Sequence, residues 1–356
     1  MRMTFVLAAA DLSGGNRVIS IYADRLVRRG HKVTIISRPR RRATLKDKTL
    51  AWLRGYPIPV NRKHWPSHFD GMASIEYRQI EKYRPIVADD LPDSDVVIAT
   101  WWETAEWVAA LPPAKGKKAY FIQHYEAHQD QDPARVDATW RLPLHKIIIA
   151  RWLVEIADKL GDKNISLVPN AVDLQQFNAP PRGKQPTPTV GVMYSVVPFK
   201  GCEVSLAAVE LARKNLPELK LVSFGNRNPM QHLLLPPGTD FTMQPAQDRI
   251  RDIYSRCDAW LVGSRSEGFG LPILEAMACR TPVIATPTGA APELVASGGG
   301  VLTPIDDPRS MAREIERIVQ LPDQQWRAMS DAAYATASTY SWDDATTLFE
   351  AALLGL

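Results

Sequence analysis

The sequence predicts an α/β protein made of two doubly wound domains, each with a parallel sheet between helices. Three observations support this prediction. The chain has 356 residues, 45% of them hydrophobic, which is enough for two cores. In both halves, short apolar runs alternate with helical patterns and glycine turns. Between the halves, residues 180–188 are rich in proline, as is typical of a linker. We therefore expect domains at 1–170 and 189–342, joined by a linker at 171–188.

The first domain is predicted to open with a strand at 4–10, a glycine turn, a helix up to Gly30 and a strand at 33–37. This order places a ligand crevice at the carboxyl end of the first strand. The turn reads Ser13-Gly14-Gly15-Asn16 and lacks the full GxGxxG pattern, so it supports dinucleotide binding poorly. Residues 43–89 have weak periodicity and many aromatic residues, among them Tyr56, which indicates loops and short helices. The remaining predicted elements are strands at 95–100, 118–122 and 165–168 and helices at 104–110 and 142–160.

The second domain is expected to alternate in the same way. Its predicted strands lie at 190–193, 219–224, 259–262 and 298–302, with a further strand ending near Ala285. Its predicted helices run through Leu206, Val209 and Leu211, and then over 250–257, from Pro272 onward, after the turn at 287–289, and over 308–319, 323–337 and 343–353.

The stretch from Gly263 to Pro287 carries the strongest chemical signal. It reads as strand, glycine-rich loop, helix and strand, with Pro272 where a first-turn residue can spare its N–H. The amides of Gly268, Phe269, Gly270 and Leu271 lie at the start of that helix and have no intrahelical acceptor. Together with the helix dipole, these amides predict an anion site.

Two carboxylates flank this anion site, Glu267 before the glycines and Glu275 inside the helix among aliphatic residues. A carboxylate buried among apolar side chains costs several kcal/mol unless a partner hydrogen-bonds it. The vicinal hydroxyls of a ribose would suit Glu275, with the diphosphate of the same nucleotide on the amides. Taken singly, each residue also has an ordinary interpretation, because Glu275 could complement the helix start and Glu267 could be a solvated loop residue.

Taken together, Glu267, seven intervening residues and Glu275, filled as EGFGLPILEAMA and followed by TPVIAT, closely resemble the donor-site signature of glycosyltransferase family 4. This resemblance implies the GT-B architecture, two Rossmann-like domains facing a central cleft. It also implies transfer of a sugar from a nucleotide diphosphate with retention of anomeric configuration. Glu267 would lie by the transferred sugar, the amides of residues 268–271 would hold the phosphates, and Glu275 would bind the ribose. The last helix, 343–356, resembles the family's C-terminal helix, which crosses back to the first domain.

The resemblance extends to the first domain. By it, Gly15 approaches the donor phosphate or the transferred sugar. His124 follows the strand at 118–122, where ligands gather in α/β domains, and the family presents a histidine there near the transferred sugar. His128 and His145 lack that placement.

In the second domain, Lys200 begins a helix and so opposes its dipole, which calls for a nearby anion such as a diphosphate. The loop from Gly225 to Asn226 is expected to form a wall beside the base. Two positions depart from the family, because Ser195 stands where many relatives have Arg and Ala171 replaces a glycine. We expect another cation, Arg265 or Arg227, to substitute, or else a weaker phosphate contact.

Composition limits the other classes of function. The net charge of +4 is mild and predicts no nucleic-acid binding. The three cysteines have no metal-ligand spacing, no Asp-x-Asp pair that could chelate a metal is expected, and we expect no metal and no cofactor. No apolar run approaches the ~20 residues of a membrane-spanning helix, and the chain starts without a cleavage-like signal. A cytoplasmic protein is therefore expected, either free or peripheral at the inner face of the membrane.

From Arg38 to Lys48 the chain has six basic residues and one acid, followed by Leu50, Trp52 and Leu53. Two interpretations remain open for this run. It could lie on an anionic lipid surface as a basic amphipathic element, or it could be a solvated loop. An RNA-binding arm is a distant third.

We therefore predict a retaining, metal-independent glycosyltransferase in polysaccharide or glycan assembly, with His124, Lys200 and Glu267 as catalytic residues. The donor is expected to be a GDP- or UDP-linked hexose and the acceptor a saccharide or lipid-linked saccharide. A GT-B sugar-nucleotide epimerase would lack the signature from Glu267 to Glu275, and a phosphorylase would need a much longer chain. An alternative of another class is a catalytically silent, nucleotide-sugar-binding or membrane-recruited scaffold, favoured only by the departures at Ser195 and Ala171.

Overall fold

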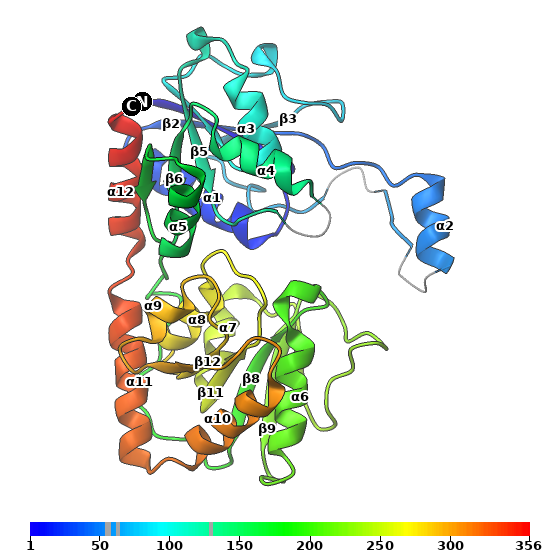
Figure 1. Ribbon diagram of the computed structural model, residues 1–356, viewed down its shortest axis with the longest axis vertical. Helices are drawn as coiled ribbons and strands as arrows, with labels where there is room; N and C mark the ends of the chain where they lie inside the picture. Colours follow the sequence, from blue (N-terminus) through cyan, green and yellow to red (C-terminus); the bar gives the residue numbers. More distant parts are fainter. Residues whose placement is uncertain (54–57, 62–64, 128–130) are drawn as a thin grey trace. The chain divides into compact units, whose positions relative to one another are not determined.

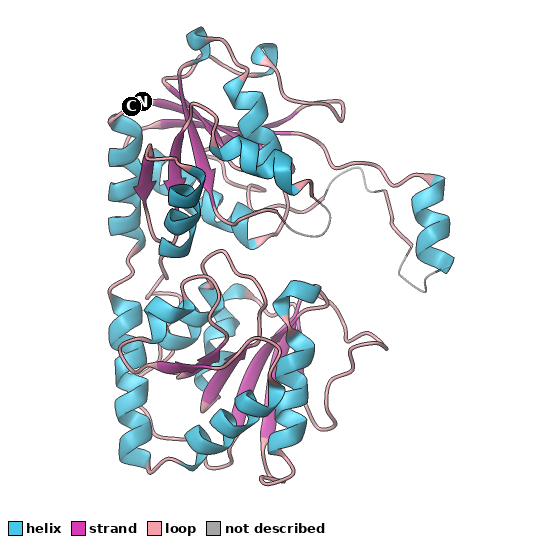
Figure 2. Ribbon diagram, in the orientation of Figure 1, coloured by secondary structure: helices cyan, strands magenta, loops and turns pink. Residues whose placement is uncertain are grey.

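The computed structural model describes residues 1–53, 58–61, 65–127 and 131–356, so Tyr56 and His128 lie outside the described residues. The chain divides into two compact units. Unit 1 comprises Met1–Ile148, Leu153–Val168 and Thr346–Leu356, and unit 2 comprises Ile149–Trp152 and Pro169–Ala345. Helices flank the strands of the sheet in each unit (Figure 2). Among the described residues, no helix combines the length and the apolar character needed to cross a membrane.

Unit 1 contains a seven-stranded parallel sheet with the order β3-β2-β1-β4-β5-β6-β7 (Figure 1). The strands are β1 (Arg2–Leu7), β2 (Lys32–Ser37), β3 (Glu76–Gln79), β4 (Val96–Ala99), β5 (Lys117–Ile122), β6 (His145–Ile148) and β7 (Ile165–Leu167). The helices are α1 (Gly14–Arg28), α2 (Leu45–Leu53), α3 (Trp102–Ala109), α4 (Pro133–Trp140) and α5 (Arg151–Leu160). The strand order reverses between β1 and β4, so ligands are expected outside the carboxyl ends of these two strands.

The end of helix α12 (Trp342–Leu354) completes the core of unit 1. Phe349 is fully buried, and its ring stacks on that of Tyr22 with the centroids 4.4 Å apart. The next residue, Glu350, accepts hydrogen bonds from Arg29 and His31, which lower its pKa. Residues 346–356 therefore belong to unit 1, and Phe349 is part of its hydrophobic core.

Unit 2 contains a six-stranded parallel sheet with the order β10-β9-β8-β11-β12-β13. The strands are β8 (Thr189–Tyr194), β9 (Lys220–Gly225), β10 (Asp240–Met243), β11 (Ala259–Val262), β12 (Val283–Ala285) and β13 (Gly300–Leu302). The helices are α6 (Cys202–Ala212), α7 (Ile250–Ser255), α8 (Leu271–Ala278), α9 (Ala291–Val295), α10 (Pro308–Gln320) and α11 (Asp323–Ser338). Here the strand order reverses between β8 and β11, and the carboxyl ends of these strands lead to Lys200 and to the loop before α8.

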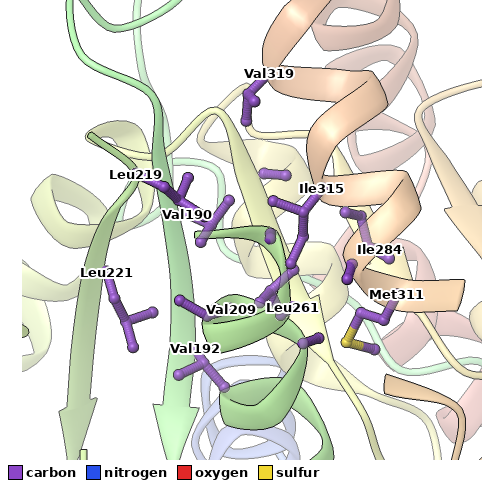
Figure 3. Close-up of a cluster of buried hydrophobic side chains, with 14 of the residues drawn as sticks. Val190, Val192, Val209, Leu219, Leu221, Leu261, Ile284, Met311, Ile315 and Val319 are labelled. Atoms are coloured by element: carbon purple, nitrogen blue, oxygen red, sulfur yellow. The ribbon is translucent and has the colours of Figure 1, made fainter. Parts of the chain in front are cut away.

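One face of this second sheet is covered by α6 and α10 (Figure 3). Met311, Ile315 and Val319 recur every four residues along α10 and face Val190, Leu261 and other buried side chains of the strands. Such strands are buried on both faces, which explains why their sequences are almost continuously apolar. The three cysteines are free and buried, as expected of small core residues.

The structure differs from the predicted elements in unit 1. The predicted helix at 142–160 is correct from Arg151 onward, where α5 begins, but wrong before it, because β6 (His145–Ile148) pairs there with β5 and β7. A run of isoleucines suits a buried parallel strand better than a helix. Strands β3 and β10 were not predicted, since each is a short edge strand with exposed residues and no apolar run. Helix α4 was also missed, although Asp132 caps it by accepting from Ala134 and Arg135.

The proline-rich segment at 180–188 is fixed to the body of unit 2. Arg182 donates to the carbonyl of Cys257 and to Thr281, 2.9 Å away, and its guanidinium lies over the ring of Trp326. Asp258 accepts from the backbone of Gln185 at 2.7 Å. These contacts join the segment to β11 and α11.

Candidate functional site

The loop between β11 and α8 turns sharply at Gly270, which has φ 97° and lies at the N-cap of α8. This backbone conformation favours glycine, and a Cβ there would also lie 3.1 Å from Ile273 Cδ1. The Phe269 ring is buried near the Tyr340 ring, with the centroids 6.0 Å apart. The loop is thus packed in place before any ligand binds.

Hydrogen bonds fix the orientation of the loop's peptide groups. Trp152 Nε1 donates to the carbonyl of Gly268 at 2.7 Å, and the amide of Ala290 donates to the carbonyl of Phe269 at 2.9 Å. In a trans peptide the N–H points opposite to the C=O. The amides of Phe269 and Gly270 therefore point away from Trp152 and Ala290.

None of the four amides of residues 268–271 donates to an acceptor within the part of the chain that the structure describes. In addition, α8 directs its positive dipole end to the same place. The structure therefore brings together the anion-binding features that the sequence predicted for this loop.

Lys200 and Glu267 form an ion pair beside these amides. Lys200 Nζ lies 2.9 Å from Glu267 Oε1 and 2.8 Å from Oε2, and Ser264 Oγ donates to Oε1 at 2.7 Å. The Glu267 side chain is 8% exposed and that of Lys200 is 26% exposed. Burial and three hydrogen bonds hold the Glu267 carboxylate in one position. Lys200 and Ser264 are thus the partners that a buried carboxylate needs.

Two glycines bring the loops of Lys200 and Glu267 together. Gly201 has φ 53°, and a Cβ at this position would lie 1.9 Å from the carbonyl oxygen of Gly263. A Cβ on Gly263 would in turn lie 2.7 Å from Ser205 Oγ. Only this close backbone contact lets the turn before α6 reach the loop before α8.

Glu275 is buried in α8 and accepts a hydrogen bond of 3.0 Å from the hydroxyl of Tyr254. The Tyr254 ring is itself fully buried and makes edge contacts with Trp260 and Phe224. The rigid aromatic cluster therefore fixes one oxygen of the carboxylate. Sequence reasoning missed Tyr254, Ser264 and Trp152, since each looks like an ordinary core or loop residue.

The loop after β9 carries the residues expected beside the base. The carbonyl of Gly225 accepts from the amide of Gln244 at 2.8 Å, and the carbonyl of Asn226 accepts from the Gln244 side chain at 3.1 Å. The two alternative cations differ. Arg265 is paired with Glu203 and Asp306, whereas Arg227 is exposed in this loop.

In unit 1, His124 follows β5 and donates from Nδ1 to the carbonyl of Tyr125 at 2.8 Å. Because a carbonyl only accepts, the neutral ring carries its proton on Nδ1 and its acceptor nitrogen is Nε2. Gly15 lies in the first turn of α1, and its carbonyl accepts from the Gln123 side chain at 3.2 Å. A Cβ on Gly15 would make an ordinary contact of 3.5 Å with Gln123, so this structure alone does not require a glycine there.

Beside His124, Glu126 is a buried carboxylate without a basic partner in any hydrogen bond of the described residues. It accepts from the amide of Trp102 at 2.8 Å and from the hydroxyl of Tyr120. Burial raises the pKa of Glu126 well above its usual range. Burial also raises the pKa of Tyr120.

The described residues contain no group of three or more His, Cys, Asp or Glu arranged to hold a metal. The expectation that the chain lacks an Asp-x-Asp pair is wrong, because two such pairs occur outside the donor segment. In the first, Asp93 pairs with Lys115 and Asp95 with Arg2. The second runs from Asp130 to Asp132, and Asp130 lies outside the described residues.

Comparison with known proteins places these features in context. Residues 175–336 match the family model described as "Glycosyl transferases group 1". A D-inositol 3-phosphate glycosyltransferase of Segniliparus rotundus is 31% identical over 203 residues, which cover 51% of this chain and 44% of that protein. An O-antigen chain mannosyltransferase B of Escherichia coli is 36% identical over 96 residues, covering 27% and 24% of the two chains. The chain thus matches less than half the length of these curated relatives.

Solved structures match the whole chain at low sequence identity. The Anabaena protein Alr3699/HepE in complex with UDP and glucose has a TM-score of 0.75 and 18% identity, with 100% of both chains covered. Sucrose-phosphate synthase from Thermosynechococcus elongatus has a TM-score of 0.74 and 18% identity, with 98% of both chains covered. At such identity, the similarity shows a shared fold.

Proposed function

We propose that this chain, which belongs to the glycosyl transferases group 1 family through residues 175–336, is a retaining glycosyltransferase. Its two parallel-sheet, Rossmann-like units have the GT-B fold, so the predicted fold and family are confirmed. In the proposed reaction, a hexose passes from a nucleotide-diphosphate sugar to an acceptor without a metal ion. The observation that carries this proposal is the segment 263–278, in which four amides without an acceptor among the described residues lie between two buried carboxylates.

The proposed donor site is built on α8. The diphosphate binds the amides of residues 268–271, where the dipole of α8 favours an anion. The ribose hydroxyls bind Glu275, whose position is supported by the hydrogen bond from Tyr254. Gly225 and Asn226 form the wall beside the base. In unit 1, Gly15 approaches the donor phosphate or the transferred sugar.

The proposed chemistry depends on charge. As the bond between sugar and diphosphate breaks, negative charge grows on the leaving group and positive charge on the sugar ring. A bound diphosphate competes with Glu267 for Lys200, which then neutralises the leaving group. Glu267 is left to orient hydroxyls of the sugar or to stabilise its cationic ring. His124 Nε2 accepts a hydrogen bond from a hydroxyl group of the transferred sugar.

The relatives and neighbouring structures suggest which donor and which acceptor to test first. The complex of HepE contains UDP and glucose, so we propose UDP-glucose as the first donor to test. A GDP-linked hexose is the second, because another relative is named a mannosyltransferase. The acceptor is proposed to be a saccharide or a lipid-linked saccharide, reached from the cytoplasmic side.

A thermal-shift panel of UDP, GDP and UMP tests the proposed donor site. A ligand at about 100 times its Kd adds about 2.7 kcal/mol of stability, or roughly 5–10 °C for a unit of this size. We expect UDP or GDP to produce this shift, UMP to produce less, and the Glu275→Ala variant to show about half of it or less. Glu210→Ala, which removes an exposed glutamate of the same unit, is the matched control.

Transfer from UDP-glucose and GDP-mannose to saccharide acceptors is then measured with the wild type and Lys200→Ala. Transfer should fall much more than nucleotide affinity in this variant. If neither nucleotide shifts the melting temperature, the donor site is wrong. If a nucleotide binds but neither transfer nor hydrolysis occurs with any acceptor, the chain is the binding scaffold instead.

A further inference from the structure

Helix α2 (Leu45–Leu53) of unit 1 has no buried residue. All four of its large apolar side chains are exposed, with Leu45 at 82%, Leu50 at 41%, Trp52 at 69% and Leu53 at 71%. Figure 1 shows the helix at the end of a loop excursion, apart from the other labelled helices of this unit. A helix of nine residues is only marginally stable in water unless an apolar face packs against something. The described residues of the chain supply no such cover, so this face is available to another surface.

The three most exposed apolar residues share one face of α2, and Leu50 lies outside it. Leu45, Trp52 and Leu53 stand at i, i+7 and i+8, which are neighbouring positions on a helix surface. At 3.6 residues per turn, Lys46 and Lys48 fall on the two borders of this face. An apolar strip between lysines is typical of helices that lie in a membrane interface, because the long basic side chains reach the headgroups.

The sequence predicted that the whole basic run from Arg38 to Lys48 could lie on a lipid surface. Two of its arginines do not belong to the exposed surface around α2. Arg38 is buried, donates to Glu103 at 2.8 Å and lies over the Tyr83 ring at 4.2 Å. Arg40 is paired with Asp11 at 2.7 Å. Both arginines therefore fix the base of the loop to unit 1.

The remaining charges near α2 are mostly positive. Arg41, Arg42 and Lys46 are exposed, and Lys48 is partly exposed. The one acid, Asp47, accepts from the amide and the hydroxyl of Thr44 and lies 3.5 Å from Arg41. Its negative charge is thus used at the start of the helix, and the surface beside the apolar face is net positive.

The chain returns from α2 through another exposed apolar pair, Ile58 at 52% and Val60 at 63%. At the base of this excursion, the amide of Ala43 donates to Asn61 Oδ1 at 2.8 Å, and Asn61 Nδ2 donates back to the carbonyl of Ala43 at 3.0 Å. These two bonds hold the outgoing and returning chains together. We refer to residues 41–53 and 58–61 as the α2 arm.

We propose that the α2 arm docks on an anionic lipid surface, with Leu45, Trp52 and Leu53 in the interface and Lys46 and Lys48 at the headgroups. An anionic bilayer complements both the apolar face and the positive border. A second copy of the chain would bring two positive arms together, which opposes pairing of this face with itself. The proposal concerns unit 1 alone and holds whether or not the chain transfers sugars.

The test is co-sedimentation of the full chain with vesicles of phosphatidylglycerol and phosphatidylcholine, compared with vesicles of phosphatidylcholine alone. Binding should be roughly tenfold tighter to the anionic vesicles and should weaken with salt. We expect Leu45→Ser/Trp52→Ser/Leu53→Ser to reduce binding by about tenfold or more. The matched control, Leu234→Ser/Leu348→Ser/Leu354→Ser, removes three exposed apolar residues elsewhere and should bind like the wild type.

A second pair of variants isolates the charge. Lys46→Glu/Lys48→Glu should weaken binding to anionic vesicles by about tenfold or more, while Lys159→Glu/Lys214→Glu, at other exposed lysines, should not. All variants should keep the melting temperature of the wild type, because none removes a buried side chain. The proposal is overturned if the wild type does not bind anionic vesicles, or if the arm variants bind as well as their controls. It is also overturned if sedimentation velocity shows that the arm joins two copies and no lipid binding accompanies it.

Discussion

Removing Lys200 should destabilise unit 2. Of the hydrogen bonds to Glu267 described above, only the one from Ser264 would remain, and the buried carboxylate would lose its cation. Breaking a buried ion pair typically lowers the free energy of unfolding by 3–5 kcal/mol (roughly). Here the Lys200 side chain is 26% exposed, so solvent already screens part of the interaction. We therefore expect Lys200→Met to lower the free energy of unfolding by about 2–3 kcal/mol, or roughly 4–12 °C in Tm.

The double variant Lys200→Met/Glu267→Gln should recover most of this stability, because it leaves no buried charge. It should lie within about 1 kcal/mol of the wild type, so the double-mutant cycle should give a coupling of about 2 kcal/mol. The assay is thermal unfolding of all four proteins. Hydrogen exchange of peptides covering α8 shows whether the loss falls in unit 2.

Arg317→Met provides the matched control, since it breaks an exposed ion pair of the same unit whose side chains are 46% and 29% exposed. Its effect should stay below about 1 kcal/mol. If the effects of Lys200→Met and Glu267→Gln add to within about 0.5 kcal/mol, the two residues do not act as a buried pair and the reasoning is refuted.

Three other predictions concern single positions. Glu275→Ala should weaken nucleoside-diphosphate affinity about tenfold or more by calorimetry, because a hydrogen bond to a charged group is worth about 1.5–3 kcal/mol; unchanged affinity would contradict its proposed place at the ribose. Gly201→Ala should lower the free energy of unfolding by more than about 2 kcal/mol, since its Cβ would lie 1.9 Å from the oxygen of Gly263, whereas Gly14→Ala, with open space around it, should have little effect on unfolding. The raised pKa of Glu126 means that the folded state keeps a proton that the unfolded state releases, so stability should fall as pH rises from the unfolded pKa of about 4.3 through the folded pKa. Glu126→Gln should lack this decline, and parallel curves of Tm against pH for the two proteins would argue against it.

The sequence alone predicted the site features that are local in the chain. Gly270, the start of α8 and the two carboxylates lie within nine residues of one another, so the spacing fixes where the helix begins and which groups flank it. The partners of these groups come from far away in sequence. Tyr254 bonds Glu275 across 21 residues, and Trp152 bonds Gly268 across 116. Nothing in the local pattern distinguishes such an aromatic residue from any other core residue.

The errors in the fold have the same cause. The sequence from His145 to Ile148 becomes a strand because β5 and β7 pair with it on both sides, and this pairing overrides a helical reading of the surrounding residues. Arg38 looked like one of several surface arginines, yet Glu103 and two aromatic rings bury it. Tertiary contacts decide both outcomes, and periodicity does not report them.

The burial of Phe349 against Tyr22, Phe5 and Phe121 has a consequence for how the protein is made. During synthesis, the three aromatic residues that pack on Phe349 are translated long before Phe349 itself, because all of unit 2 lies between them in the sequence. At about 5–20 residues per second, the gap between Phe121 and Phe349 amounts to roughly 10–45 s, during which unit 2 is translated. Until then, the nascent N-terminal half exposes the aromatic surface that Phe349 later covers.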